Sequence, residues 1–481
     1  MKNPMRRRLA VPGNSLIKNA IFNVFYRVLN VIFPLVTAAY VARVLEPEGV
    51  GKVAYAQNIV SYFVMFAVLG IPRYGTREIA KCRQNPDARD KLFTELIVIN
   101  TVSTMLCGLG YYLSVFYGLL GDSVVYLVCG TELLFNFINI DWFYQGEEEY
   151  VYITLRSVLI KVLSIFALFT FVRNKQDYPI YALITCFGLG CNNIFNVIHA
   201  RTRVKLTFRG LEFKKHFKPI MFLMLSVIAA SLYNKVDITM LGLMAKEDAV
   251  AYYVNANKMI TMVLTLVTAI SGVFMPRLSF LYETDRVQFE KLITKGVKIV
   301  LLLAIPCCVG LIMVAKDAVQ ILFGVQFLPT VPALRILSSL IVVIGVCDLL
   351  CLQAIISSGN ERFLIWSRVV AGITNIMLNA LLIPHLQHVG AAIASVISEI
   401  IVNGMIFPVA LKVVRPKIEM KFCFSLLFST IIMLCAVLVI QHSVGTPFSR
   451  LLASVVGGIT VFAIVLLLTK NELVNEIAGS W

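Results

Sequence analysis

The sequence predicts an all-α polytopic membrane protein of about fourteen transmembrane helices, arranged as two six-helix lobes followed by two additional C-terminal helices. Hydrophobic residues make up 59% of the 481 residues and charged residues only 15%, so the polar surface that soluble domains of this size need cannot be assembled. Apolar runs of about twenty residues recur along the whole chain. This is the length of helix that crosses a hydrocarbon core about 30 Å thick.

Short polar loops separate the predicted spans and give the chain its topology. The spans cover residues 19–44, 53–71, 92–116, 123–142, 153–172, 179–199, 220–243, 249–274, 297–314, 332–356, 363–383, 389–411, 422–440 and 451–469. Most of the 43 lysine and arginine residues fall in loops on one side, which the positive-inside rule assigns to the cytoplasm. We therefore expect both termini in the cytoplasm and no cleaved signal peptide.

The net charge of +16 is explained by this topology, so we expect no nucleic-acid partner. The richest basic loops are Arg73–Lys91 and Arg201–Lys218, and such segments also attract anionic lipid head groups. Membrane lipids are therefore expected partners. The eleven cysteines and five histidines show no metal-ligand spacing, so we expect no metal site and no bound cofactor.

A weak internal repeat divides the spans into two units. Residues 44–60 align with residues 244–260, with Val50 on Val250, although chance similarity between apolar helices is the alternative. Because six is an even number, both units enter the membrane from the same side and are related by an axis along the membrane normal. The predicted organisation is an N-terminal lobe at 1–200, a basic cytoplasmic linker at 201–218, a C-terminal lobe at 219–411, and two additional helices with a short tail at 412–481.

Charged residues within the spans are the strongest functional indication. Eight lie deep: Arg27, Glu132, Lys161, Lys235, Asp237, Lys258, Asp348 and Glu399. Each costs about 3 kcal/mol to insert, whereas the net stability of a protein is about 5–15 kcal/mol. They must therefore pair between helices or face a hydrated cavity, which we expect between the two lobes. Glu95, Asp141 and Arg156 lie nearer span ends and are expected to snorkel to the membrane boundary.

The deep residues sort by chemistry into binding and coupling candidates. The candidate anion-binding cations are Arg27, Lys161, Lys235 and Lys258; arginine in particular grips phosphate oxygens in pairs. Asn192 and Asn196 in the sixth span suit sugar hydroxyls, with interhelical hydrogen bonding as the alternative. The acids that could couple transport to a proton or sodium gradient are Asp237, Glu132, Asp348 and Glu399.

Enzyme motifs are missing from the sequence. Gly49-Val50-Gly51-Lys52 hints at a phosphate-binding loop, but Glu46 replaces its first glycine and Val53 its serine or threonine. We expect no catalytic residue and no ATP-using machinery in this chain.

Several short motifs carry a resemblance to a known family. They are Val41-Ala42-Arg43-Val44-Leu45, Gly70-Ile71-Pro72-Arg73-Tyr74-Gly75, Arg77-Glu78-Ile79-Ala80, Asp141-Trp142, Phe323-Gly324 and Ile383-Pro384. In this order the sequence resembles the polysaccharide exporters of the multidrug/oligosaccharidyl-lipid/polysaccharide superfamily, which include the O-antigen and capsule repeat-unit flippases. The resemblance covers nearly the whole chain and implies a MATE-like fold of two six-helix lobes plus two helices.

The resemblance also implies a function. It is the alternating-access transfer of an undecaprenyl-diphosphate-linked oligosaccharide from the cytoplasmic to the outer leaflet of the bacterial inner membrane, for O-antigen, capsule or exopolysaccharide synthesis. Polysaccharide polymerase and ligase machinery would be partners. Arg27 and Lys258 occupy the first and eighth helices, where similar flippases carry basic residues for the diphosphate; Lys258 stands where an arginine is expected.

Two other classes of function compete with this interpretation. An ion-coupled MATE-type exporter of small organic molecules would have a lobe dominated by acids, and Asp237 and Glu132 keep it open. A membrane glycosyltransferase or polymerase acting on the same lipid would need a long extracytoplasmic loop with paired carboxylates, which the sequence does not offer.

Overall fold

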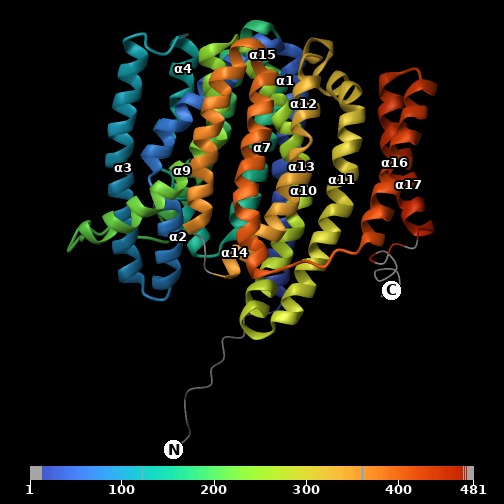
Figure 1. The fold of residues 1–481 in the computed structure, drawn as a ribbon. Helices are drawn as coiled ribbons and strands as arrows, with labels where there is room; N and C mark the ends of the chain where they lie inside the picture. Colours follow the sequence, from blue (N-terminus) through green and yellow to red (C-terminus); the bar gives the residue numbers. More distant parts are fainter. Residues whose placement is uncertain (1–12, 122, 359–361, 470, 472, 474–481) are drawn as a thin grey trace, which may run out of the picture. The chain divides into compact units, whose positions relative to one another are not determined.

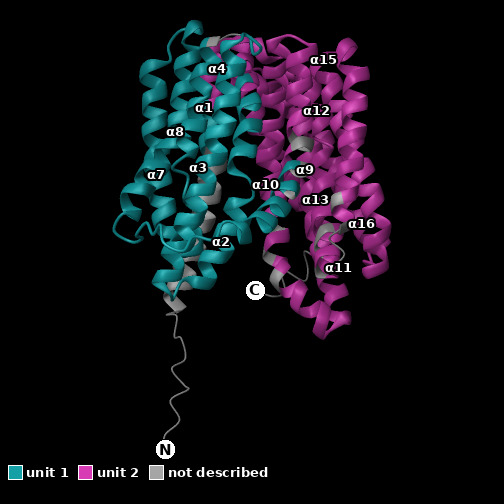
Figure 2. Cartoon of the chain, turned by 90° about the vertical axis from the view of Figure 1, so that its left-hand side faces the viewer, with its two compact units in different colours: residues 1–37, 56–228 teal, residues 38–55, 229–481 magenta. Residues whose placement is uncertain are grey.

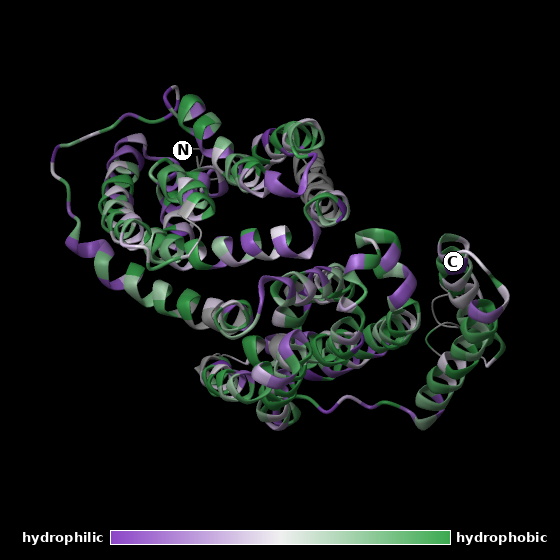
Figure 3. Cartoon of the chain, turned by 90° about the horizontal axis from the view of Figure 1, so that it is seen from above, coloured by the Kyte–Doolittle hydropathy of each residue, from purple (hydrophilic) through white to green (hydrophobic). Residues whose placement is uncertain are grey.

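The computed structural model describes residues 13–121, 123–358, 362–469, 471 and 473 (Figure 1). These residues form helices joined by short connections, and no strand occurs among them. Nine helices within the described ranges are long and apolar enough to cross a membrane. Hydrophobic positions predominate along the helices, while the connecting segments carry many hydrophilic ones (Figure 3). The predicted all-α membrane fold is therefore confirmed.

The helices follow one another in the order predicted from the apolar runs. The first part of the chain forms α1 (Gly13–Val68), α2 (Ile71–Cys82), α3 (Pro86–Phe116), α4 (Ser123–Cys129), α5 (Thr131–Asn136), α6 (Asp141–Gly146), α7 (Tyr150–Phe171) and α8 (Tyr178–Ala200). The second part forms α9 (Lys214–Met244), α10 (Glu247–Thr284), α11 (Arg286–Phe323), α12 (Thr330–Leu337), α13 (Leu340–Cys347), the π-helical segment η3 (Asp348–Leu352), α14 (Gln353–Ser357), α15 (Arg362–Val413), α16 (Met420–Ser443) and α17 (Pro447–Leu468).

Two of the longest helices each contain two predicted spans that meet at a sharp break. The break in α1 is at Glu46, whose φ is 54°, and the break in α15 is at Gln387, whose φ is 48°. Pro47 follows Glu46, and a residue before proline is disfavoured in the α region, which accounts for the first break. With both breaks in place, most of the fourteen predicted spans fall on helical residues, whereas the spans 123–142 and 332–356 are each divided among several short helices.

The chain divides into two compact units (Figure 2). Unit 1 contains residues 1–37 and 56–228, and unit 2 contains residues 38–55 and 229–481. The break in α1 thus lies in a segment that belongs to unit 2, although the rest of α1 belongs to unit 1. The lobe boundaries at residues 200, 219 and 411 stay a prediction.

Unit 1 has an aromatic core around α2, α3 and α6. The buried residues of α2 recur at helical spacing on one face, and Gly75 on that face lets the helix approach Trp142, because a Cβ there would lie 2.6 Å from the indole ring. Phe93 of α3 packs against Trp142 and Phe143 of α6, with ring centroids 5.7 and 5.1 Å apart. This packing holds the start of α6, including Asp141, in place.

In unit 2, the additional helices α16 and α17 pack against each other and against α11. Phe422 and Met433 of α16 and Phe462 of α17 share an apolar cluster with α11. At the other end, Arg450 of α17 holds the buried Asp317 of α11 through two hydrogen bonds to its two carboxylate oxygens, of which the Nε contact is 2.7 Å long. Such a paired contact fixes the orientation of both side chains.

Gly51 lies against the backbone of another helix in unit 2 and gives a first prediction. A Cβ at Gly51 would lie 1.9 Å from the carbonyl oxygen of Glu247, at the start of α10. Gly51→Ala must push this backbone apart, so we expect a loss of about 1–3 kcal/mol in the free energy of unfolding. Unfolding of the purified protein in detergent, followed by tryptophan fluorescence, measures the change.

Gly404→Ala in α15 is the matched control, because no heavy atom of the described structure lies within 4 Å of the added methyl. Alanine is also the better helix former. Equal stability of the two variants would contradict the predicted contact.

Candidate functional site

Unit 1 holds an ion pair between the buried Arg156 and the half-buried Asp141, and this pair connects three helices. Arg156 of α7 lies 3.2 Å from Asp141 Oδ1 at the start of α6, and its guanidinium also donates to the side-chain oxygen of Asn196 on α8. Asn196 in turn donates to Asp141 Oδ1. Arg156 and Asn196 are buried. The expectation that Arg156 snorkels to the membrane boundary was therefore wrong, because a carboxylate partner is available inside the unit.

A polar cavity of about 200 Å³ adjoins this ion pair. Its polar lining consists of Glu132, Asn136, Asn139, Asp141 and Asn193. Carboxamide and carboxylate groups of this kind can bind water or hydroxyl groups. The volume is below the 300–1,000 Å³ typical of ligand pockets, so the cavity can hold water or one part of a larger ligand, but not an oligosaccharide.

The asparagines of α8 have different environments. Asn196, a candidate binding residue, is engaged with Arg156 and Asp141, and the candidate Asn192 donates to the Gly188 carbonyl at 3.1 Å. Asn193, which the sequence places with them as a group suited to sugar hydroxyls, lines the polar cavity and donates to the Phe135 carbonyl. The sequence placed all three on one helix but could not decide which of them faces the cavity.

Unit 2 contains a buried carboxylate with polar partners from three elements. Asp237 of α9 accepts hydrogen bonds from Tyr253 of α10 at 2.5 Å, from Ser395 in the second half of α15 at 2.7 Å, and from Asn379 in its first half at 2.7 Å. Asn379 also donates to Asn375 Oδ1 at 3.0 Å. We call these five residues the Asp237 site.

The Asp237 site is rich in oxygen atoms that a small cation could bind. Its carboxylate forms no ion pair with any residue that the structure describes, and Asn379 Oδ1 is buried without a hydrogen-bond partner. Carboxylate, amide and hydroxyl oxygens are the ligands that hard cations prefer. The arrangement can therefore take up a proton on Asp237 or a cation among these oxygens.

The other three coupling candidates lie in separate environments. Glu132 lines the polar cavity of unit 1. In unit 2, Asp348 begins the π-helical segment η3 and is half-buried, and Glu399 accepts a hydrogen bond of 3.3 Å from Asn403 on its own helix. Across the described residues, no three His, Cys, Asp or Glu side chains converge as metal ligands. Asp237 accepts hydrogen bonds from three described side chains.

The candidate cations are distributed over both units. The Arg27 side chain lies outside the described residues. Lys161 of α7 lies 5.7 Å from the centre of the Phe33 ring, a cation–π distance. Lys235 precedes Asp237 by two residues on α9, and Lys258 is half-buried on α10. Within the described part of the chain, Lys258 forms no ion pair, which leaves its charge available for an anion.

A second buried polar cluster in unit 1 was not identified from the sequence. His216 at the start of α9 contacts Glu95 of α3 at 2.7 Å and Tyr74 of α2 at 2.7 Å, and Lys215 lies 3.3 Å from Glu95. Glu95 is fully buried, so the expectation that it snorkels was also wrong. In the adjoining loop, a hydrogen bond from Lys91 holds the pKa of the exposed Glu212 carboxyl below its ordinary value. This cluster secures the loop before α9.

The fold and the buried polar groups together define a polytopic helical membrane protein whose two units each have a charged interior. A family model described as "Polysaccharide biosynthesis protein" matches residues 16–281. Because this match covers more than half of the chain, the chain belongs to the polysaccharide biosynthesis protein family.

Known relatives and structures agree with this assignment. The chain is 24% identical over 398 residues to a protein named "Putative O-antigen transporter" from Escherichia coli (strain K12), covering 81% of this chain and 95% of that protein. Among solved structures, it is similar to the lipid II flippase MurJ in an inward closed conformation, with a TM-score of 0.75, 18% identity, and coverage of 95% of this chain and 100% of MurJ.

A multidrug resistance MATE family transporter of the MOP superfamily, in an inward-facing conformation, has the same fold. The TM-score is 0.62 at 16% identity, with coverage of 82% of this chain and 99% of the transporter. The MATE-like fold that the sequence motifs implied is therefore confirmed.

Proposed function

We propose that this protein is a flippase that transfers an undecaprenyl-diphosphate-linked oligosaccharide from the cytoplasmic to the outer leaflet by alternating access. The main support is membership of the polysaccharide biosynthesis protein family, with a relative named as an O-antigen transporter aligned over 95% of its length. The protein acts as a transporter and not as an enzyme. It resides in the bacterial inner membrane with both termini in the cytoplasm. The transported oligosaccharide is then used by polymerase and ligase machinery.

The environment of Lys258 in the structure supports an anionic substrate. A diphosphate carrying a polar glycan cannot cross hydrocarbon without compensation of its charge. Lys258 lies within a predicted span and has no ion-pair partner among the described residues, so a substrate anion can supply the missing charge. Arg27, Lys161 and Lys235 are the other proposed anion-binding residues, and Asn192 and Asn196 the proposed glycan-binding ones.

The proposed coupling residue is Asp237. A flippase without ATP-using motifs needs another source of directionality, and a proton or sodium gradient can provide it. Of the four acids proposed from the sequence, Asp237 has the hydroxyl and amide partners that suit cation exchange. Glu132, Asp348 and Glu399 are then structural or secondary.

The test of this function is the fate of the lipid-linked intermediate in cells. Cells lacking the protein should accumulate undecaprenyl-diphosphate-linked oligosaccharide in the cytoplasmic leaflet, and the parent protein should clear it. Arg27→Ala and Lys258→Ala should fail to do so at normal expression. Lys246→Ala is the control, because Lys246 precedes α10 and is exposed.

An alternative result would point to another class of transporter. If the lipid-linked intermediates stay normal and sensitivity to organic cations changes instead, the protein is an ion-coupled MATE-type exporter and the flippase proposal fails. If Lys246→Ala is as defective as Lys258→Ala, the anion-binding role of Lys258 fails.

A further inference from the structure

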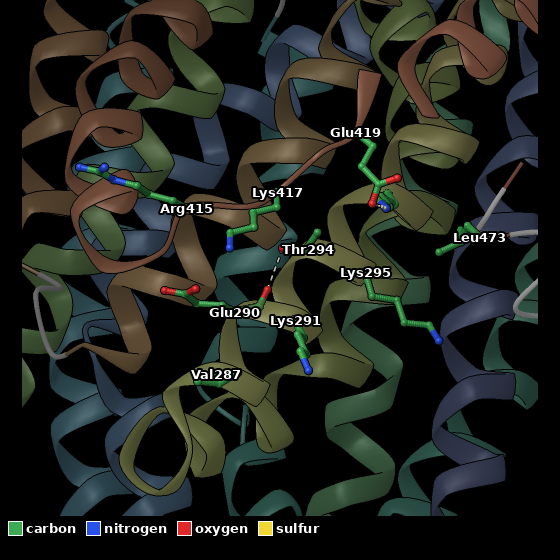
Figure 4. A pocket seen from close by; sticks show the side chains of 10 residues that line it. Val287, Glu290, Lys291, Thr294, Lys295, Arg415, Lys417, Glu419 and Leu473 are labelled. Carbon is green, nitrogen blue, oxygen red and sulfur yellow. Dashed lines mark hydrogen bonds and ion pairs between the residues drawn. The ribbon is translucent and has the colours of Figure 1, made fainter. Parts of the chain in front are cut away.

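A basic pocket of about 390 Å³ lies in unit 2, apart from the Asp237 site (Figure 4). It is formed by the first turns of α11 and by the connection from α15 to α16 at residues 414–419. The cations that line it are Lys291, Lys295, Lys298, Arg415 and Lys417. Among the described residues, the acids in the lining are Glu290 and Glu419. The pocket therefore carries an excess of positive charge that favours an anionic ligand.

Three of these five cations have no ion-pair partner in the described part of the chain. Lys291, Arg415 and Lys417 are exposed and form no ion pair with any described residue. Lys298 lies 3.8 Å from Glu419, so one acid of the pocket is already engaged. Figure 4 shows the labelled side chains on α11 and on the connection, with the long basic side chains extending in different directions. A phosphate group could be contacted from both segments.

The pocket lies where the membrane boundary is expected. α11 has 38 residues and is about 57 Å long, almost twice the thickness of the hydrocarbon core. Its predicted span begins at residue 297, so the charged turns before it project toward the side that the charge distribution assigns to the cytoplasm. α16 begins at Met420 directly after the connection. Both segments thus place their cations at the depth of lipid head groups.

An apolar groove lies at the start of α16, which follows the pocket-lining Glu419 directly in the sequence. The groove, of about 490 Å³, is lined by Met420, Phe422 and Phe424 among others. Met420 is 83% and Phe424 69% exposed. Lys298 connects the two hollows, because it contacts Glu419 of the pocket and lies 5.6 Å from the Phe422 ring of the groove. A ligand with an anionic head and an apolar chain matches both.

We propose that this pocket and groove bind an anionic phospholipid of the cytoplasmic leaflet, with its phosphate among the five cations and an acyl chain in the groove. The lipid holds the connection at residues 414–419 against α11 and so positions the α16–α17 pair. This inference does not depend on the flippase function, so it would still hold if that function were disproved.

The test is lipid binding to the full-length protein in detergent, measured by native mass spectrometry. Dioleoyl phosphatidylglycerol should bind, and dioleoyl phosphatidylcholine should bind much more weakly. The double variant Lys291→Gln/Lys417→Gln should weaken phosphatidylglycerol binding by roughly thirtyfold, because each basic residue contributes about 1 kcal/mol to the attraction of an anionic lipid. Both residues are exposed, so the fold should be retained.

The charge-matched control is Arg173→Gln/Lys175→Gln, which removes two exposed cations of unit 1 that lie outside the two basic loops. Its phosphatidylglycerol binding should equal that of the parent. An equal loss in both double variants would overturn the proposal, because binding would then follow net charge alone. Displacement of the lipid by millimolar inorganic phosphate would overturn it too, since the pocket would be a site for free phosphate.

Discussion

Asp237→Asn is expected to abolish gradient-driven transport while leaving the protein folded. The Asp237 carboxylate accepts hydrogen bonds from Tyr253, Ser395 and Asn379. Asparagine has nearly the same shape and keeps one oxygen acceptor, and the two hydroxyl partners can rotate to accept from its new NH₂ group. It cannot take up a proton or supply a negative charge to a cation, so gradient-dependent flipping should fall at least tenfold (about 1.4 kcal/mol).

The measurement is transport of a fluorescent lipid-linked oligosaccharide by the purified protein in liposomes. A pH jump at constant sodium and a sodium jump at constant pH are applied separately, so that the coupling ion is identified in the same experiment. Thermal unfolding in detergent, followed by tryptophan fluorescence, checks that the variant is folded.

Glu399→Gln is the control, because Glu399 is also an intramembrane acid of unit 2 but has a described partner on its own helix, Asn403. Loss of coupling in this variant, with Asp237→Asn active, would move the coupling role to Glu399. Full activity of both variants would exclude both acids.

Asp141→Ala is expected to cause the largest loss of stability. It leaves the buried Arg156 guanidinium without its carboxylate, and an uncompensated buried charge of this kind costs about 3–5 kcal/mol. The Arg156 guanidinium is already incompletely hydrogen-bonded, because its Nε is buried without a hydrogen-bond partner. Unfolding by SDS titration in mixed micelles measures the difference from the parent.

The double variant Asp141→Ala/Arg156→Met separates loss of charge balance from loss of packing. Removing both charges should recover most of the stability, because the uncompensated charge is gone and methionine fills an apolar space of similar length. If Asp141→Ala alone is within 1 kcal/mol of the parent, Arg156 must reach the membrane boundary without Asp141. The paired interior of unit 1 would then be disproved.

The two expectations that failed have a common cause. Glu95 and Arg156 lie near the ends of apolar runs, and a long side chain at such a position can normally reach water. In the structure each meets a partner that is distant in sequence: His216 for Glu95, and Asp141 with Asn196 for Arg156. A hydropathy profile indicates how deep a residue lies along its own helix. It does not show which residues of other segments contact it.

The Asp237 site was likewise only partly predictable from the sequence. The sequence singled out Asp237 because a carboxylate in an apolar span is costly, but it did not identify Tyr253, Asn379 or Ser395 as its partners. Asn375 and Asn379 are four residues apart and so share a helix face, which was the one available indication. Nothing in the spacing tells which helix that face meets.

What the sequence determined by itself is the class of fold and the order of its helices, while the break before Pro47 has a local cause that the sequence contains. These follow from local quantities: the length of apolar runs, which must match the thickness of the membrane, and the restricted backbone before proline. The tertiary structure alone decided which charges are paired, that Asn193 faces the polar cavity, and that the connection at residues 414–419 meets α11 in a basic pocket. These depend on contacts between segments that lie far apart in the chain, since a side chain's charge and hydrogen bonds are satisfied by its neighbours in space.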